Sequence, residues 1–216
     1  SHYAHLEKKL CQAAKIVFCT SAYLGRKIKQ RTGVPCQILR NGLANDFKIY
    51  PKVPLKSDGV ELAYFGTISE WFDFDLIEKL SEYFEIHLYG PLEVSIPQIQ
   101  NIHYHGSVAH AAIQAEMQKY DVLIMPFIVN ELIKSVNPVK LYEYVASGKV
   151  VLAPDYEETR VFGNLIFRYT KLTEILNHLE HDREPVDDSI RKEFIQNSTW
   201  SGRLASVLKD INLLAK

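Results

Sequence analysis

The stretch from Asn137 to Gly148 holds the residues whose types and order best suit the binding of an anion. Asn137 is a favourable helix N-cap and Pro138 suits the first helical position, so a helix is expected over Pro138–Ser147. Free backbone amides would then lie at the positive end of the helix dipole, in Val139, Lys140 and Leu141. The amides and the dipole together predict a phosphate site at this helix start.

Two charged side chains extend the predicted site. Lys140 adds a positive charge at the same end of the helix. Side chains on a helix tilt toward its N-terminus, so Glu143 would direct its carboxylate toward the part of the ligand beyond the phosphate, where a ribose diol suits two oxygens. The alternative is a solvated Glu143 paired with Lys140. Glutamate before lysine is the better order for such a pair, and here lysine comes first, so ligand binding is favoured.

Three glycines directly follow or end apolar runs that are typical of strands: Gly66, Gly90 and Gly106. In open α/β sheets, ligands bind at the carboxyl ends of the strands, and glycine lets the backbone approach a ligand closely. One such glycine is weak evidence because a turn needs one anyway, whereas three at one edge predict a cleft. None of them forms the G-x-G-x-x-G fingerprint, which disfavours a hydride-transfer enzyme.

Weaker candidates have simpler explanations. The sequence Asp73–Asp75 could bind a metal, but Asp73 is more readily the cap of the helix that follows. His103 and His105 share one face of a strand without a third ligand at suitable spacing, which favours a structural role. Trp71 and Tyr89 could stack on a ligand, although aromatic residues at strand ends more often pack in a core. No Ser/His/Asp or Cys/His nucleophile arrangement is evident.

Short apolar runs alternate with amphipathic stretches after residue 60, which predicts βαβ units. The expected fold is therefore α/β, with a parallel sheet and helices on both faces. Strands are expected at Glu61–Phe65, Glu85–Tyr89, Ile102–His105, Val122–Met125 and Val150–Ala153. The intervening helices are expected at Asp73–Tyr83, Ala109–Gln118 and Pro138–Ser147. A helical tail follows, at Leu172–Leu179, Asp188–Gln196 and Thr199–Leu214.

The residues before this region predict a smaller unit with the order helix-strand-helix-strand. Its elements are expected at Ser1–Leu10, Ile16–Thr20, Ser21–Thr32 with Ser21 as N-cap, and Gln37–Leu39. The aperiodic, proline-containing piece Asn45–Gly59 is expected to be a linker. Because the first residue is Ser1 rather than a methionine, we expect the chain to be part of a longer protein.

Composition narrows the class of protein. The 216 residues are 47% hydrophobic, enough to bury a large core, and 25 Lys and Arg balance 26 Asp and Glu, which argues against a nucleic-acid partner. The 3 cysteines are odd in number and lie within the first 36 residues, which predicts no disulfide framework and a reducing compartment. Neither a signal-peptide pattern nor an apolar run long enough for a bilayer is evident. A cytoplasmic protein is expected.

The segment Asn137–Val151 resembles the donor-binding segment of GT-B glycosyltransferases. The likeness is greatest to bacterial family 4-type enzymes that build surface polysaccharides, the teichuronic-acid-type transferases among them. It covers nearly the whole chain, and its other parts are Ser21, Arg40–Gly42, Tyr64–Asp73, His103–Gly106 and Asp121–Phe127.

This resemblance implies the C-terminal, donor-binding half of a GT-B enzyme. Residues 1–44 would be a remnant of the N-terminal acceptor domain, residues 45–59 the linker, and residues 60–216 a Rossmann-like nucleotide-sugar-binding domain with a helical tail. The implied reaction moves a sugar from a UDP- or GDP-linked donor to a glycan or lipid-linked acceptor in cell-surface polysaccharide synthesis, with retention of configuration. No metal or other cofactor is implied, and the intact protein could associate peripherally with the inner face of the membrane.

The resemblance also implies roles for single residues. Glu143 matches the glutamate that binds the nucleotide ribose, and the amides of Val139, Lys140 and Leu141 would hold the diphosphate. Gly66 and Thr67 match the loop that faces the diphosphate and the sugar. The rest of the implied donor-binding set is Ser135, Asn137, Pro138, Gly90 and Gly106. No catalytic residue is implied in this half, so the isolated piece is expected to be inactive.

The sequence departs from the family pattern at two places. Ser135 stands where a sugar-contacting glutamate is usual, and Glu70–Asp73 replaces a basic pair after the glycine loop. The identity of the sugar therefore stays open. Two alternatives remain: a non-hydrolysing nucleotide-sugar epimerase of the same fold, which would need carboxylates near the sugar, and a non-catalytic nucleotide-binding or interaction module.

Overall fold

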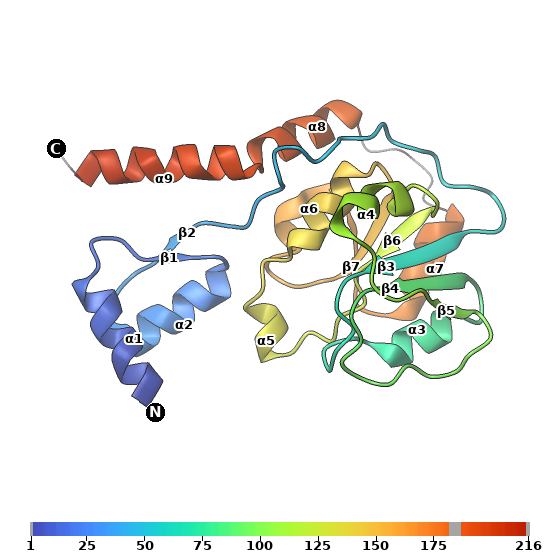
Figure 1. Ribbon diagram of the computed structural model, residues 1–216, viewed down its shortest axis with the longest axis horizontal. Helices are drawn as coiled ribbons and strands as arrows, with labels where there is room; N and C mark the ends of the chain where they lie inside the picture. The colour runs from blue at the N-terminus through green and yellow to red at the C-terminus, as the bar shows by residue number, and fades with distance from the viewer. Residues whose placement is uncertain (1, 182–186, 215–216) are drawn as a thin grey trace.

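Six parallel strands form the main sheet in the computed structural model, which describes residues 2–181 and 187–214 (Figure 1). The order across the sheet is β5-β4-β3-β6-β7-β8, and each neighbouring pair is parallel. The strands are β3 (Glu61–Phe65), β4 (Glu85–Tyr89), β5 (Ile102–Tyr104), β6 (Val122–Ile124), β7 (Val150–Pro154) and β8 (Phe167–Tyr169).

The chain reverses its direction across the sheet between β3 and β6. From β3 it proceeds outward to β4 and β5, and it then returns to the other side of β3 to form β6, β7 and β8. At such a switch point the connections leave the two central strands in opposite directions, so a crevice forms at their carboxyl ends. The fold thereby places a ligand-binding crevice next to the end of β3.

Successive residues of the central strands point to opposite faces of the sheet, and helices cover both. Ala63 and Phe65 belong to the core formed with α4 and α6, whereas Leu62 and Tyr64 belong to the core formed with α3 and α7. The covering helices are α3 (Phe74–Leu80), α4 (His110–Met117), α6 (Val139–Ala146) and α7 (Leu172–His181). Burial on both faces explains the continuous apolar runs in the sequence. The expected α/β fold is confirmed.

The N-terminal residues form a small unit beside the main sheet (Figure 1). Its elements are α1 (His2–Ala13), β1 (Phe18–Cys19), α2 (Ala22–Thr32) and β2 (Gln37–Ile38), and β1 pairs with β2 in parallel. The expected N-cap is confirmed, because the Ser21 side chain accepts a hydrogen bond from the amide of Leu24 at 3.1 Å. The expected first helix began at Ser1, and the expected last domain ended at Lys216. Both residues lie outside the described part of the chain.

Residues 45–59 contain no helix or strand, yet they are fixed to the main unit. Phe47 is buried in the core beside α6. The amide of Tyr50 donates to the carbonyl of Ala146 at 2.9 Å, and that of Val53 donates to the carbonyl of Gly148 at 3.1 Å. This connection therefore runs along the C-terminal end of α6.

Three short elements were not expected from the sequence. They are α5 (Glu131–Lys134), a 3₁₀ helix η1 (Arg160–Leu165) and the edge strand β8. Four residues of α5 cannot show a helical period, and β8, with Arg168 at its centre, pairs with β7 alone. All the expected strands and helices are present, with ends that differ by a few residues.

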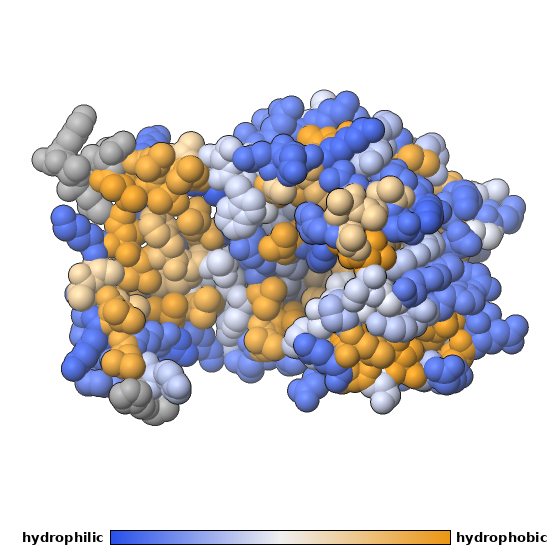
Figure 2. Space-filling view, viewed as in Figure 1, coloured by the Kyte–Doolittle hydropathy of each residue, from blue (hydrophilic) through white to orange (hydrophobic). Residues whose placement is uncertain are grey.

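Two helices, α8 (Asp188–Asn197) and α9 (Trp200–Leu214), end the described chain, and α9 extends away from the main sheet (Figure 1). Trp200, the first residue of α9, is 45% exposed because α9 leaves the core at this point. Large apolar side chains are exposed along the helix, and Figure 2 shows hydrophobic surface gathered at this end: Trp200, Leu204, Leu208 and Ile211. Within the described residues, no helix combines the length and apolar character needed to span a bilayer.

Candidate functional site

A cavity of about 470 Å³ lies at the carboxyl ends of β3 and β6, where the strand order reverses. This volume is within the range of small-molecule sites. The wall combines the segment after β3, the segment after β6, the short helix α5 and the start of α6: Tyr64, Gly66, Thr67, Trp71, Met125, Phe127, Leu132, Ile133, Val136, Pro138, Val139 and Lys140. The topology thus brings the glycine loop and the predicted phosphate helix to one cavity.

The loop after β3 is held in a fixed shape. The Tyr64 hydroxyl donates to the carbonyl of Thr67 at 2.8 Å, and the amide of Gly66 donates to the carbonyl of Tyr89 at 2.9 Å. A Cβ on Gly66 would lie 2.5 Å from the Tyr64 hydroxyl, so a larger residue would displace this bond. Gly66 and Thr67 therefore line the cavity as a tight backbone turn.

The start of α6 differs from the expectation. The helix begins at Val139, so Pro138 occupies the N-cap position, and no side chain of the described residues caps it. The prediction of Asn137 as N-cap is wrong, because its side chain is occupied elsewhere: Nδ2 donates to Glu158 at 3.0 Å and Oδ1 accepts from the amide of Asn41 at 2.9 Å. The amides of Val139 and Lys140 are consequently left without a side-chain acceptor, whereas the amide of Leu141, also predicted to be free, donates to the Pro138 carbonyl at 3.3 Å.

Lys140 and Glu143 form an ion pair at the edge of the cavity. The Nζ of Lys140 lies 2.8 Å from Oε2 of Glu143, although the order of the two residues disfavoured a pair. Glu143 is only 7% exposed, so the pair is not the solvated one considered as an alternative. Burial makes an unpaired carboxylate costly, which explains why the pair forms despite its order. Lys140 lines the cavity and Glu143 lies behind it.

The remaining predicted site residues lie outside the cavity wall. Ser135 is turned away, since its hydroxyl donates to the carbonyl of Glu131 at 3.1 Å. Gly90 packs against the glycine loop so closely that a Cβ on it would lie 2.0 Å from the carbonyl oxygen of Gly66. The amide of Gly90 donates in turn to the carbonyl of Gly106 at 2.9 Å. These two glycines support the loop of Gly66 from behind.

The weaker candidates are also placed. Asp73 caps α3, accepting from the amide of Leu76 at 3.0 Å, as expected. His103 pairs with Glu85 at 2.6 Å, and across the described part of the chain no three His, Cys, Asp or Glu side chains are arranged to hold a metal ion. Tyr89 stacks on Phe65 with ring centroids 4.6 Å apart in the core. Trp71 packs against the core, as expected, and it also lines the cavity.

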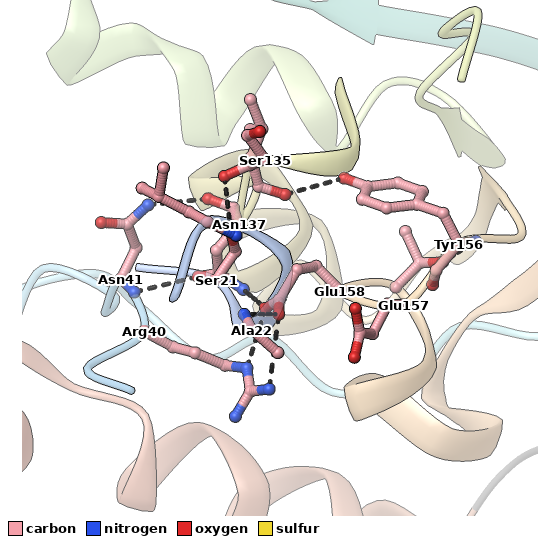
Figure 3. A network of polar contacts seen from close by, with 12 residues as sticks. Ser21, Ala22, Arg40, Asn41, Ser135, Asn137, Tyr156, Glu157 and Glu158 are labelled. Carbon is pink, nitrogen blue, oxygen red and sulfur yellow. Dashed lines mark hydrogen bonds and ion pairs between the residues drawn. The ribbon is translucent and has the colours of Figure 1, made fainter. Parts of the chain in front are cut away.

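A buried polar network beneath the start of α6 was not predicted (Figure 3). At its centre is Glu158, whose side chain is fully buried after the carboxyl end of β7. Its carboxylate accepts from the Arg40 Nε at 2.8 Å, the Ala22 amide at 2.9 Å and the Asn137 Nδ2 at 3.0 Å. The position of Glu158 after a strand end was the only local signal, because its partners are distant in sequence.

Solved structures of other proteins share this fold. No protein-family model and no curated protein sequence matches the chain. Among solved structures, it is similar to the lipopolysaccharide outer core galactosyltransferase WaaB in its apo form, with a TM-score of 0.67 and 12% identity over 92% of this chain and 62% of that one.

Two further structures are similar. Anabaena Alr3699/HepE, solved in complex with UDP-glucose, gives a TM-score of 0.64 at 13% identity over 97% of this chain and 67% of that one. The UDP-forming α,α-trehalose-phosphate synthase from Burkholderia vietnamiensis gives 0.66 at 12% identity over 98% and 62%. The chain thus spans about two thirds of the length of these enzymes. This chain has the fold of a GT-B glycosyltransferase domain.

Proposed function

We propose that this chain is the donor-binding half of a glycosyltransferase that uses a nucleoside diphosphate sugar. The observation that carries the proposal is the cavity at the β3–β6 switch point, which the uncapped start of α6 and the glycine loop share. The structural neighbours are glycosyltransferases, and one of them was solved with UDP-glucose.

The diphosphate would lie at the start of α6. The amides of Val139 and Lys140 offer hydrogen bonds there, whereas that of Leu141 already donates to the Pro138 carbonyl. The helix dipole favours negative charge, and the Lys140 ammonium adds a full positive charge. In the transfer step, an acceptor hydroxyl oxygen bonds to the anomeric carbon and gives up its proton. The bond between that carbon and the diphosphate oxygen breaks, and its electrons leave with the diphosphate. The donors at the helix start stabilise this developing charge.

The ribose would be bound by Glu143. Without a nucleotide, Lys140 neutralises this nearly buried carboxylate at 2.8 Å. A phosphate at the helix start competes with Glu143 for the Lys140 ammonium. The ribose hydroxyls then replace this ammonium as the hydrogen-bond donors to Glu143. Each buried charge keeps a partner through this exchange, which limits its desolvation cost.

The finer parts of the proposal rest on the sequence resemblance. The sugar would pass to a glycan or lipid-linked acceptor in cell-surface polysaccharide synthesis of the teichuronic-acid type, with retention and without a metal or cofactor. The acceptor and any catalytic base would be bound by the other half of the enzyme, so the chain alone would not transfer sugar.

The free cysteines support a cytoplasmic location. The intact protein would associate peripherally with the inner face of the membrane. Cys11, Cys19 and Cys36 are all unpaired. Burial and the neighbouring Cys36 raise the pKa of Cys19 to about 12, so this thiol is unreactive.

The first prediction tests the ribose and phosphate contacts. UDP-, GDP- and ADP-sugars are added in turn to the chain, and melting temperature and calorimetric Kd are measured. At least one is expected to bind, and Glu143→Gln is expected to weaken that binding by roughly tenfold, about the worth of one charged hydrogen bond. Glu131→Gln is the matched control, because Glu131 forms an exposed ion pair with Lys134 three residues away. No binding by the parent chain, or equal Kd values for parent and Glu143→Gln, would contradict the proposal.

A further inference from the structure

We propose that Glu158 is a positioning residue for the phosphate site, acting through Asn137. This inference rests on the proposed function and concerns a residue outside the cavity wall. Glu158 is fully buried, and a buried carboxylate is tolerated only when charged and polar donors satisfy it. Its donors come from three separate parts of the chain: Arg40, the amide of Ala22 at the start of α2, and Asn137 before α6 (Figure 3).

The network connects the N-terminal unit to the segment that leads into α6. The Ser21 hydroxyl donates to the carbonyl of Ser135 at 2.8 Å. The amide of Asn41 donates to Oδ1 of Asn137 at 2.9 Å, and Nδ2 of Asn41 donates to the Asn137 carbonyl at 2.7 Å. Both units are therefore held together at the residues directly before the phosphate helix.

Asn137 connects the polar network to the cavity wall through its two neighbours in the chain. Its neighbours on both sides, Val136 and Pro138, line the cavity, whereas Asn137 itself is only 2% exposed and faces the network. Asparagine is a favourable N-cap, so a free Asn137 side chain could turn to accept from the first amides of α6. Those are the amides that the proposal assigns to the diphosphate.

Glu158 prevents that competition. By accepting from Nδ2 of Asn137, it fixes the amide group so that Oδ1 faces Asn41 and Tyr142 rather than the helix start. The first amides of α6 stay available to a phosphate. The other donors to Glu158 belong to the N-terminal unit. The position of that unit and the availability of the helix amides to a phosphate therefore depend on the same carboxylate.

The test compares UDP with UMP, because only UDP carries the distal phosphate that the start of α6 would hold. Kd values for both are measured by calorimetry below the melting temperature of every variant. Glu158→Gln is expected to lower the UDP/UMP affinity ratio about fivefold, the worth of a typical N-cap contact. Glu157→Gln is the matched control, since Glu157 is its partly exposed neighbour in sequence and pairs with Arg26.

A double-mutant cycle separates positioning from loss of stability. In an Asn137→Ala background no side chain is left to cap α6, so Glu158→Gln is expected to leave the UDP/UMP ratio unchanged. If Glu158→Gln does not fold, Tyr142→Phe removes one of the bonds that hold the Asn137 side chain, the one that its Oδ1 accepts from the Tyr142 hydroxyl at 3.2 Å, and is expected to lower the ratio in the same direction by a smaller factor.

An unchanged ratio in both Glu158→Gln and Tyr142→Phe, or an equal drop with and without Asn137, would overturn the inference while nucleotide binding by the parent stands. Failure of the parent to bind either nucleotide would overturn the proposed function and this inference together.

Discussion

His87 on β4 packs among aromatic rings from β5, from the residue after β5 and from the segment after α4. Its ring centroid is 5.0 Å from that of His103, 5.2 Å from that of His105 and 4.6 Å from that of Tyr120. Its Nδ1 lies 2.9 Å from Nε2 of His105, while its Nε2 is buried without a hydrogen-bond partner in the described structure. Burial, followed by the charges of His103 and His105, lowers the pKa of His87 to about 4, although Glu85 opposes the shift.

The second prediction concerns the stability of the fold in acid. The unfolded chain binds a proton at His87 near pH 6.5, whereas the folded chain does so only near pH 4. The unfolded state therefore binds more protons in this interval, and the free energy of unfolding is expected to fall as pH drops from 6.5 to 4. His87→Phe should make the decline shallower in urea titrations at several pH values. Substitution of the exposed His110 by Phe is the control, and equal slopes for His87→Phe and the parent would refute the assignment.

At the scale of elements, the strand ends support one another. The amide of Gly66 after β3 donates to the last residue of β4, and Gly90 after β4 donates to the carbonyl of Gly106 after β5. Gly90 has φ +135°, a conformation that side chains rarely adopt, and its backbone lies against Gly66. All three glycines were expected to lie at the ligand, but Gly66 alone of the three lines the cavity, and Gly90 and Gly106 hold its loop in place. Their spacing could not show this, because turns and ligand contacts both favour glycine.

The third prediction uses two of these glycines. Gly90→Ala is expected to lower the free energy of unfolding by roughly 2 kcal/mol or more, because a strained φ adds to a clash with the Gly66 carbonyl, and to weaken nucleotide binding. Gly106→Ala is the matched control: it also has positive φ, at +74°, but a Cβ there meets no atom within 4 Å. Chemical denaturation measures both variants. A loss for Gly90→Ala no larger than for Gly106→Ala would show that the close packing does not matter.

At the scale of the whole molecule, segments distant in sequence join the N-terminal unit to the main one. Leu43 and Thr199 form a parallel bridge, with the amide of Leu43 donating to the Ser198 carbonyl at 2.8 Å and that of Trp200 donating to the Leu43 carbonyl at 3.0 Å. The hydrophobic surface beyond this crossing lies along α9 (Figure 2). The crossing and the Glu158 network together set where the N-terminal unit sits.

Arg191 makes another long-range connection, at the opposite end of α6 from the proposed phosphate site. Its side chain is 4% exposed and donates from Nη1 to the Val145 carbonyl at 2.8 Å and from Nη2 to the Tyr50 carbonyl at 2.6 Å. A cation at the C-terminal end of a helix is favoured by the dipole. Arg191 thereby fixes α8, α6 and the 45–59 connection to one another.

The fourth prediction removes this connection. Arg191→Met is expected to lower the free energy of unfolding by roughly 3 kcal/mol, because buried carbonyls lose their donor. Lys192→Met is the control, since Lys192 is exposed and pairs with the same Asp188 at 2.8 Å; it should change stability by less than about 1 kcal/mol. Urea denaturation of both variants gives the comparison. Similar small effects for the two would mean that the carbonyls find other donors.

The amino-acid sequence alone predicted the main helices, the parallel α/β fold and every strand of the main sheet except β8, because these depend on the periodicity of neighbouring residues. It also indicated the glycine loop and the start of α6, which share the cavity. The tertiary structure decided what the polar side chains do. Asn137 is a good N-cap by its local sequence, yet contacts with Asn41 and Glu158, 96 and 21 residues away, turn it from the helix. Burial of Glu143 likewise makes it pair with Lys140, although lysine before glutamate is the less favourable order for a pair on a helix. A buried polar group takes whichever partner the fold brings within hydrogen-bond distance, and that partner is not encoded by its neighbours in the chain.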